Sequence, residues 1–289
     1  MIQSKNGEYS LKTSHLILAL GNSARDTFRM LHASGVAMEP KSFAVGVRIE
    51  HLQRDIDMSQ YGEAATLGTL PAVSYKLAVH LDSGRSVFTF CVCPGGTVVA
   101  AASESGGVVT NGMSEYARDG ENINGGLLVG VSPEDFDGLF GGMDFQRELE
   151  LAAYRAGGGR YCAPAQRVGD FLNHRPSVGH GKIMPSYAPA VRYCNLWDVL
   201  PEFICQSIAD ALPKMDKKIH GIADPDAVLT AVETRSSCPI RILRNDKYEA
   251  NIRGIYPAGE GAGYAGGITT SAVDGIKCAE AILEGIAEE

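Results

Sequence analysis

A glycine-rich segment near the end of the chain constrains the possible folds more than any other feature. It reads Gly254-Ile-Tyr-Pro-Ala-Gly-Glu-Gly-Ala-Gly-Tyr-Ala-Gly-Gly267. Residues 252–258 are mostly apolar and predict a short strand, while residues 269–286 carry apolar side chains at steps of three and four, which predicts a helix. Each glycine costs conformational entropy on folding. A strand–turn–helix unit with so much glycine therefore indicates a backbone that approaches a ligand closely.

The turn of this unit carries one acidic residue, Glu260. A carboxylate at the end of a strand can accept hydrogen bonds from ribityl or sugar hydroxyls, and the free N–H groups at a helix start favour negative charge. Reduced flavin develops such charge on its pyrimidine side. An ordinary glycine-rich turn, with Glu260 as a helix-capping acid, is the alternative. The residues expected to bind a cofactor here are Gly259, Glu260, Gly261, Gly266, Gly267 and Ile268.

The beginning of the chain repeats this pattern. Residues 15–20 form an apolar run that ends at Gly21, as in a buried parallel strand, and residues 22–34 predict a helix capped by Asn22 or Ser23. We expect residues 15–20 and 252–258 to lie side by side as parallel strands. Gly21, Asn22 and Arg25 would then approach the cofactor, although Arg25 is equally compatible with a solvated helix position.

The residues between these two ends predict a mixture of strands and helices. The expected fold class is α/β plus α+β: the matching strand–turn–helix units at 1–38 and 250–289 would form one discontinuous domain, and residues 39–249 would form an inserted domain with antiparallel strands. The strands are expected at 42–50, 73–81, 85–93, 96–103 and 126–131, with a hairpin turn at Asp82-Ser83-Gly84. Helices are expected at 133–156 and 198–212, an ordered loop region at 158–195, and a short helix or turn at 226–232.

Four further segments resemble a family of largely uncharacterised FAD-dependent dehydrogenases. They are Leu20-Gly-Asn-Ser-Ala-Arg-Asp-Thr-Phe28, Phe43-Ala-Val-Gly-Val-Arg-Ile-Glu-His51, Cys91-Val-Cys-Pro-Gly-Gly96 with Asn111-Gly-Met-Ser114, and Glu233-Thr-Arg-Ser-Ser-Cys-Pro239. Members of that family are about twice as long, and their amino-terminal half carries the glycine loop that holds the ADP of FAD. No such loop precedes a helix near the start of this chain.

The resemblance implies that 1–38 and 250–289 form a split Rossmann-type FAD-binding remnant and that 39–249 form an inserted substrate domain. It also implies a role for the chain in an FAD-dependent oxidoreductase. The chain would be its carboxy-terminal, flavin-closing and substrate-binding part, with a nicotinamide nucleotide (NAD(P)H) as a candidate electron donor. The isolated chain is then expected to bind FAD weakly or not at all. The alternatives are a flavoprotein that acts on RNA and a non-catalytic binding or interaction domain.

Four polar residues are candidates for the active site: Arg48, His51, Glu233 and Arg235. Arg48 lies on a predicted strand, and Glu233 and Arg235 precede the last strand, so these side chains could face substrate or flavin. The alternatives are a surface histidine at position 51 and a structural turn with a salt bridge at 233–235. The substrate is expected to be a small molecule of unknown identity.

Composition excludes several other functions. The net charge is −8, and no basic cluster exceeds Lys217-Lys218, so we expect no nucleic-acid partner. No apolar run reaches the length of a membrane span. The first residues are polar and the seven cysteines are irregularly spaced, which predicts reduced thiols, a cytoplasmic protein and no metal site. Cys91 and Cys93 are expected to be unbonded core residues on one strand face.

Overall fold

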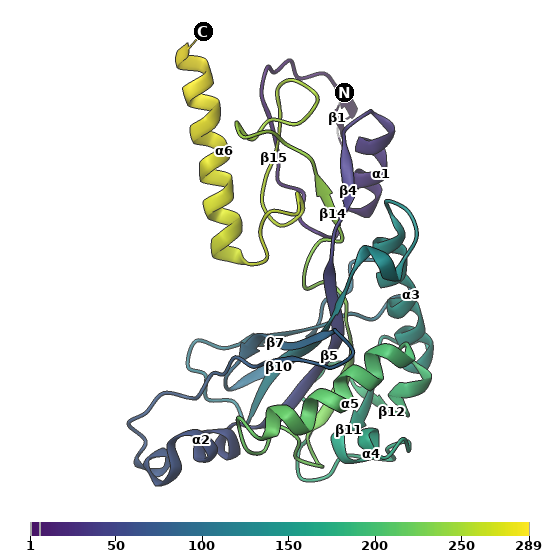
Figure 1. Ribbon diagram of the computed structural model, residues 1–289, viewed down its shortest axis with the longest axis vertical. Coiled ribbons are helices and arrows are strands. Elements are labelled where there is room, and N and C mark those ends of the chain that lie inside the picture. Colours follow the sequence, from purple (N-terminus) through teal and green to yellow (C-terminus); the bar gives the residue numbers. More distant parts are fainter. Residues whose placement is uncertain (1, 6, 289) are drawn as a thin grey trace. The chain divides into compact units, whose positions relative to one another are not determined.

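The computed structural model describes residues 2–5 and 7–288, and it divides the chain into two compact units (Figure 1). Unit 1 combines residues 1–41, 137–143 and 237–289, and unit 2 combines residues 42–136 and 144–236. The chain therefore passes between the units four times. The boundaries differ from the expected 38/39 and 249/250 because strand β14 (Ile240–Ile242) pairs with β4 (Met38–Pro40) inside unit 1.

Unit 2 is built on a mixed sheet of seven strands. Its long central pair is β5 (Phe43–Leu52) and β10 (Asn122–Val131), which lie antiparallel and in register over their whole length. Only the β11–β12 pair is parallel, and the other neighbouring pairs are antiparallel. The strand order is β12 (Val191–Tyr193), β11 (Ala163–Arg167), β13 (Val228–Glu233), β5, β10, β7 (Ser86–Cys93) and β6 (Ala78–His80).

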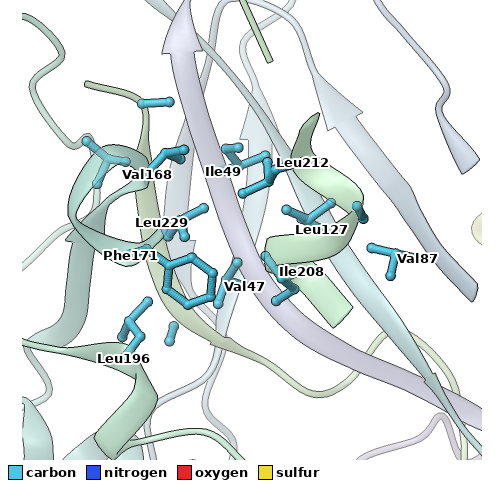
Figure 2. Packing of buried hydrophobic residues seen from close by; sticks show 14 of the residues in the cluster. Val47, Ile49, Val87, Leu127, Val168, Phe171, Leu196, Ile208, Leu212 and Leu229 are labelled. Carbon is cyan, nitrogen blue, oxygen red and sulfur yellow. The ribbon is translucent and has the colours of Figure 1, made fainter. Parts of the chain in front are cut away.

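One face of this sheet carries the main hydrophobic core. Strand β5 alternates, so Val47 and Ile49 point to the same face. Figure 2 shows Ile208 and Leu212 of helix α5 (Glu202–Asp216) lying over these strand residues. Helix α4 (Val168–Leu172) adds Phe171. Full burial of such a side chain stabilises the fold by roughly 1.5–3 kcal/mol.

The opposite face of the sheet is covered by a second, smaller sheet. Strands β8 (Gly96–Ala100) and β9 (Thr110–Ser114) form an antiparallel pair that packs against β10, β5, β7 and β13. The residues of β5 on this side include Arg48 and Glu50, both fully buried. Buried charges need partners, so this polar face is a natural place to look for a functional site.

Unit 1 contains the two ends of the chain. Strand β3 (Leu16–Leu18) pairs in parallel with β15 (Ile255–Pro257), which confirms the predicted neighbourhood of residues 15–20 and 252–258. A short hairpin joins β1 (Ile2–Ser4) to β2 (Gly7–Tyr9). Helix α1 (Arg25–Ala33) packs Phe28 and Leu31 with Ile240 and Ile242. Assignment of these parts to a split Rossmann-type domain stays a prediction.

Helix α6 (Ile268–Glu288) closes unit 1 and matches the helix expected at 269–286. Its apolar residues are only partly covered, since Ile276, Leu283 and Ile286 are each at least half exposed. Among the described residues, no helix combines the length and the apolar composition that crossing a membrane requires.

Several sequence-based expectations were wrong or incomplete. Of residues 226–232, which were expected to form a short helix or turn, only the beginning is a turn, and residues from 228 on belong to the fully buried strand β13 (Val228–Glu233). An apolar run of this length fits a strand or a helix equally well. The region 158–195 contains β11, α4 and β12. Helix α3 (Gly141–Ala156) begins at Gly141 rather than at the expected residue 133, and a separate 3-10 turn at Pro133–Asp135 precedes it. Other unexpected elements are helix α2 (Gln53–Tyr61), 3-10 turns at Gly62–Leu67 and Leu196–Asp198, and strands β4, β9 and β14.

Candidate functional site

The glycine-rich turn of unit 1 is held in place where it leaves β15. Gly259 has φ +77°, a left-handed conformation that favours glycine, and its N–H donates to Oδ2 of Asp274 at 2.7 Å. Asp274 lies on α6 and is paired with Arg244, whose Nη2 is 2.6 Å from Oδ1. Nη1 of Arg244 also donates to the carbonyl of Pro257 at 2.7 Å. One ion pair therefore ties the end of β15, its turn and α6 together.

Glu260 connects this turn to the turn that follows β3. Its Oε1 accepts a hydrogen bond from Nδ2 of Asn22 at 2.6 Å. Glu260 is half-buried, and this burial raises the pKa of its carboxyl group, while the Asn22 hydrogen bond and the nearby charge of Lys41 oppose the rise. Asn22 is not the cap expected for α1, because its amide is used in this link and the helix begins after Ala24 without a side-chain cap.

The backbones of the two turns touch. A Cβ atom added to Gly261 would lie 2.3 Å from the carbonyl oxygen of Gly21, so only glycine fits at position 261. The rest of the turn is open: a Cβ atom on Gly266 would meet no atom within 4 Å, and Ile268 is 93% exposed. The structure thus brings Gly21, Asn22, Glu260 and Gly261 together.

The other predicted cofactor residues lie around this contact. Gly259 opens the turn, Gly267 and Ile268 lead into α6, and Arg25 is buried in the first turn of α1. Lys41, which follows β4, was not predicted from the sequence. Lys41 interacts electrostatically with Glu260 because β4 pairs with β14. No pattern of residues in the sequence predicts that pairing.

These residues fit part of a flavin nucleotide. Glu260 supplies an acceptor for ribityl or ribose hydroxyls, and the open backbone at Gly266 leaves room for a flat group. A cavity of about 700 Å³ lies at the opposite ends of the same two strands, lined by residues that include His15, Gly254 and Tyr256. Ligands of parallel sheets bind at the carboxyl ends of the strands, so the Glu260 end is the better candidate.

Unit 2 carries a second candidate site on the polar face of its sheet, centred on Arg48. The Nε atom of Arg48 is 2.5 Å from Oε2 of Glu233, and Nη2 is 3.3 Å from Oε1. Nη2 also donates to Oδ1 of Asn111 at 2.8 Å, and Nη1 donates to Oδ1 of Asn124 at 3.2 Å and to the Cys91 carbonyl at 2.7 Å. Both Nη atoms therefore have hydrogen-bond partners, and Nε lies in an ion pair with Glu233.

Glycines make room for this ion pair. A Cβ atom on Gly112 would lie 2.2 Å from Oδ1 of Asn124 and 2.7 Å from Nη1 of Arg48, and one on Gly126 would lie 3.0 Å from Glu233. Burial raises the pKa of Glu233 to about 7, even though the charge of Arg48 lowers it. The carboxyl group is thus close to half protonation at neutral pH, a condition that suits proton transfer.

The remaining candidate residues lie elsewhere. His51 points to the apolar face, where its Nε2 is 3.0 Å from the Ile222 carbonyl and burial lowers its pKa. Arg235 forms an ion pair with Glu150 at 2.9 Å. This contact agrees with the alternative expectation of a structural salt bridge at 233–235. Glu50, next to Arg48 on the same face, accepts hydrogen bonds from Asn122 and Ser186 instead, and burial raises its pKa.

The two cysteines of β7 differ from the expected pair of core residues. Both are free thiols, and Cys93 is buried, but Cys91 is exposed. The register between β7 and β10 shifts between Asn124 and Gly126, and Cys91 has φ +45° at this bulge. The alternation expected for a regular strand is therefore broken at Cys91. Among the described residues, no cluster of histidine, cysteine and acidic side chains is arranged to hold a metal ion.

Comparison with known proteins supports a flavin-related function. Residues 42–236, which span all of unit 2 and the segment 137–143 of unit 1, match the family model described as FAD-dependent protein, C-terminal domain-like. The chain is also 49% identical over 273 residues to an uncharacterized protein of Clostridium beijerinckii. That match covers 93% of this chain and 51% of the relative, so the chain spans about half the length of this relative.

Proposed function

The chain belongs to the family of FAD-dependent proteins with this C-terminal domain, and from that premise we propose that it is the flavin-closing and substrate-binding part of an FAD-dependent oxidoreductase, specifically a dehydrogenase. The relative's additional half would supply the rest of the FAD site, including the ADP-binding glycine loop. Unit 2 would bind a small-molecule substrate, and a nicotinamide nucleotide is the electron donor in this proposal.

One observation carries the proposal: Asn22 and Glu260 meet at the carboxyl ends of the parallel strands β3 and β15, with Gly261 against Gly21. Two turns that are far apart in the sequence thereby form one surface at the place where nucleotides bind in parallel sheets. A carboxylate and open glycine backbone are the groups that such a ligand needs.

The residues of the chain would then have separate tasks. Glu260 would accept hydrogen bonds from hydroxyl groups of the nucleotide, and Asn22 would hold its carboxylate in position. The first N–H groups of α6, which have no partner within the helix, would stabilise negative charge on the bound ring. FAD, when bound, supplies the redox chemistry by accepting and passing on a hydride or electrons.

A non-catalytic interaction domain is the second candidate function. It is favoured by the exposed apolar residues of α6, because exposed apolar clusters often mark interaction surfaces. An RNA-directed flavoprotein has less support, since the net charge of −8 disfavours a polyanion. Bound flavin in the purified protein would distinguish the enzyme from the interaction domain.

The test is FAD binding, followed by the quenching of flavin fluorescence, for the chain alone and for a version extended to the length of the relative. Glu260→Ala should weaken binding by roughly ten- to a hundred-fold, the loss expected for a charged hydrogen bond. Glu284→Ala, an exposed position on α6, is the matched control. Equal affinity of the Glu260→Ala variant and the parent would refute the assignment of this turn to FAD.

A further inference from the structure

We propose that Cys91 is a nucleophilic thiolate and that Cys93 is the thiol that resolves its adducts, so that the pair reduces small disulfides. The residues that carry this proposal all belong to unit 2, and the reaction needs no flavin. Its outcome is therefore independent of the FAD-binding test above.

The backbone places the two sulfur atoms differently from a regular strand. Two residues of β7, Cys91 and Val92, lie opposite Gly125 of β10 at the bulge. Cys91 adopts a left-handed conformation that costs free energy for a residue other than glycine, and such conformations cluster at functional sites. The bulge exposes Cys91 while Cys93 stays buried, with its Sγ donating to the Cys91 carbonyl at 3.3 Å.

The surroundings of Cys91 favour its ionised form. The Cys93 thiol lies beside Cys91 and donates to its carbonyl oxygen at 3.3 Å, and the buried guanidinium group of Arg48 donates to the same carbonyl at 2.7 Å. Together they lower the pKa of Cys91 to about 5, against the opposing effect of burial. Glu233 is the acidic group that faces Cys91, and its ion pair with Arg48 limits its repulsion.

Cys93 has the opposite properties. Its hydrogen bond to Cys91 and its burial raise its pKa, so that it keeps its proton beside a thiolate. Burial also raises the pKa of Cys194, Cys205, Cys238 and Cys278. A low-pKa, exposed thiolate beside a second thiol is the arrangement of reactive cysteines, whereas buried thiols are inert.

A nearby amide adds a free hydrogen-bond donor. Asn124 lies opposite Cys93 in the strand register and is fully buried. Its Oδ1 accepts from Arg48, but its Nδ2 has no hydrogen-bond partner among the residues that the structure describes. An unused buried donor is costly, so this amide is an unsatisfied polar group in the strand pair that carries the two cysteines.

The proposed reaction balances without any further reagent. The Cys91 thiolate attacks one sulfur of a disulfide RSSR, forms a Cys91–S–S–R bond and releases RS⁻. Cys93 then loses its proton and attacks the Cys91 sulfur, which releases a second RS⁻ that takes up this proton as RSH. The small disulfide is reduced, and the two cysteines are oxidised to a Cys91–Cys93 disulfide.

The experiment treats the reduced chain with dithiodipyridine at about pH 6, which lies well below the pKa of an ordinary thiol. The parent should rapidly release two equivalents of thiopyridone, and peptide mass spectrometry should find Cys91 linked to Cys93. Cys93→Ala should release one equivalent and retain a thiopyridyl group on Cys91. Cys162→Ala, at another partly accessible cysteine, should behave as the parent does.

A second measurement separates a reactive site from a merely accessible one. The rate of Cys91 alkylation by iodoacetamide, followed by peptide mass spectrometry, should reach half its maximum near pH 5 in the parent. This midpoint should rise by at least about one pH unit in Cys93→Ala, which lacks the hydrogen bond. Alkylation of Cys91 with the midpoint of an ordinary thiol, or a stable Cys91 adduct in the parent, would overturn the proposal.

Discussion

Arg48 and Glu233 form an ion pair in the interior of unit 2, with Nε of Arg48 2.5 Å from Oε2 of Glu233 and side-chain exposures of 0% and 3%. Removing both groups from water costs free energy that their attraction only partly repays. The raised pKa of Glu233, about 7, reflects this desolvation. A buried ion pair of this kind adds little net stability to the fold. Its presence therefore favours a functional role for Arg48 and Glu233.

Glu233→Gln should change how the stability of unit 2 depends on pH. Because the pKa of Glu233 is higher in the folded protein, about 7, than its ordinary value of 4.5, the folded protein holds this proton more tightly. The stabilisation is fully present below pH 4.5 and is lost as the pH rises to about 7, by up to about 3 kcal/mol. The amide of the substituted side chain does not titrate. The free energy of unfolding of the variant should therefore rise relative to that of the parent over this pH range.

The measurement is urea unfolding followed by the fluorescence of Trp197, the one tryptophan of the chain, which lies in unit 2. Glu63→Gln, at an exposed position, serves as the control and should keep the pH dependence of the parent. If the unfolding free energy of the parent instead rises relative to that of Glu233→Gln between pH 4.5 and 7, the attraction of Arg48 outweighs desolvation. The pKa of Glu233 would then be lowered in the folded protein, not raised.

Gly112→Ala should disrupt the Arg48 cluster from the hairpin side. The new methyl group would lie 2.2 Å from Oδ1 of Asn124 and 3.0 Å from Cζ of Arg48, and both of these side chains are fully buried. Overpacking of this kind costs typically about 1–3 kcal/mol of unfolding free energy. Gly179→Ala is the matched control in the same unit, because its Cβ would meet nothing within 4 Å. Unfolding midpoints that fall equally for both variants would contradict the packing described.

The fold could be predicted from the sequence mainly where residue patterns are local. The strand–turn–helix units at both ends, the β6–β7 hairpin and strand β5 followed from apolar periodicity and glycine positions. Strand β13 could not be recognised, because the apolar run at 226–232 does not distinguish a buried strand from a helix. The pairing of β4 with β14 joins segments about two hundred residues apart and leaves no local pattern.

The candidate sites were predictable in composition rather than in geometry. Arg48 and Glu233 were both selected as polar residues near expected strands, but their contact depends on the β5–β13 register. His51 was selected with them although strand alternation turns it to the apolar face. Cys91 was misjudged because a bulge is set by the pairing with β10, and the sequence pattern shows only the regular alternation that the bulge breaks.

Asp274→Ala should loosen the glycine-rich turn of unit 1. The change removes the acceptor of the Gly259 N–H and the partner of Arg244, and losing a charged hydrogen bond costs about 1.5–3 kcal/mol. Hydrogen–deuterium exchange over residues 258–267 should therefore become faster by more than about tenfold. Glu280→Ala, an exposed position on the same helix, is the control. Unchanged exchange in Asp274→Ala would mean that the turn is held by other contacts.

The last prediction separates a glycine needed for the fold from one needed for the ligand. Gly261→Ala would place its methyl group 2.3 Å from the Gly21 carbonyl, so it should lower both the stability of unit 1 and the affinity for FAD. Gly266→Ala meets no atom within 4 Å in the structure, so its stability should match that of the parent. If the flavin ring lies against this backbone, the same methyl group should still reduce FAD affinity by about tenfold or more. Gly285→Ala, equally open but far along α6, should change neither quantity.

The measurement combines thermal unfolding with FAD titration of the version extended to the relative's length. Full affinity in Gly266→Ala would show that the ring does not approach this part of the turn, and it would confine the flavin contact to Asn22 and Glu260.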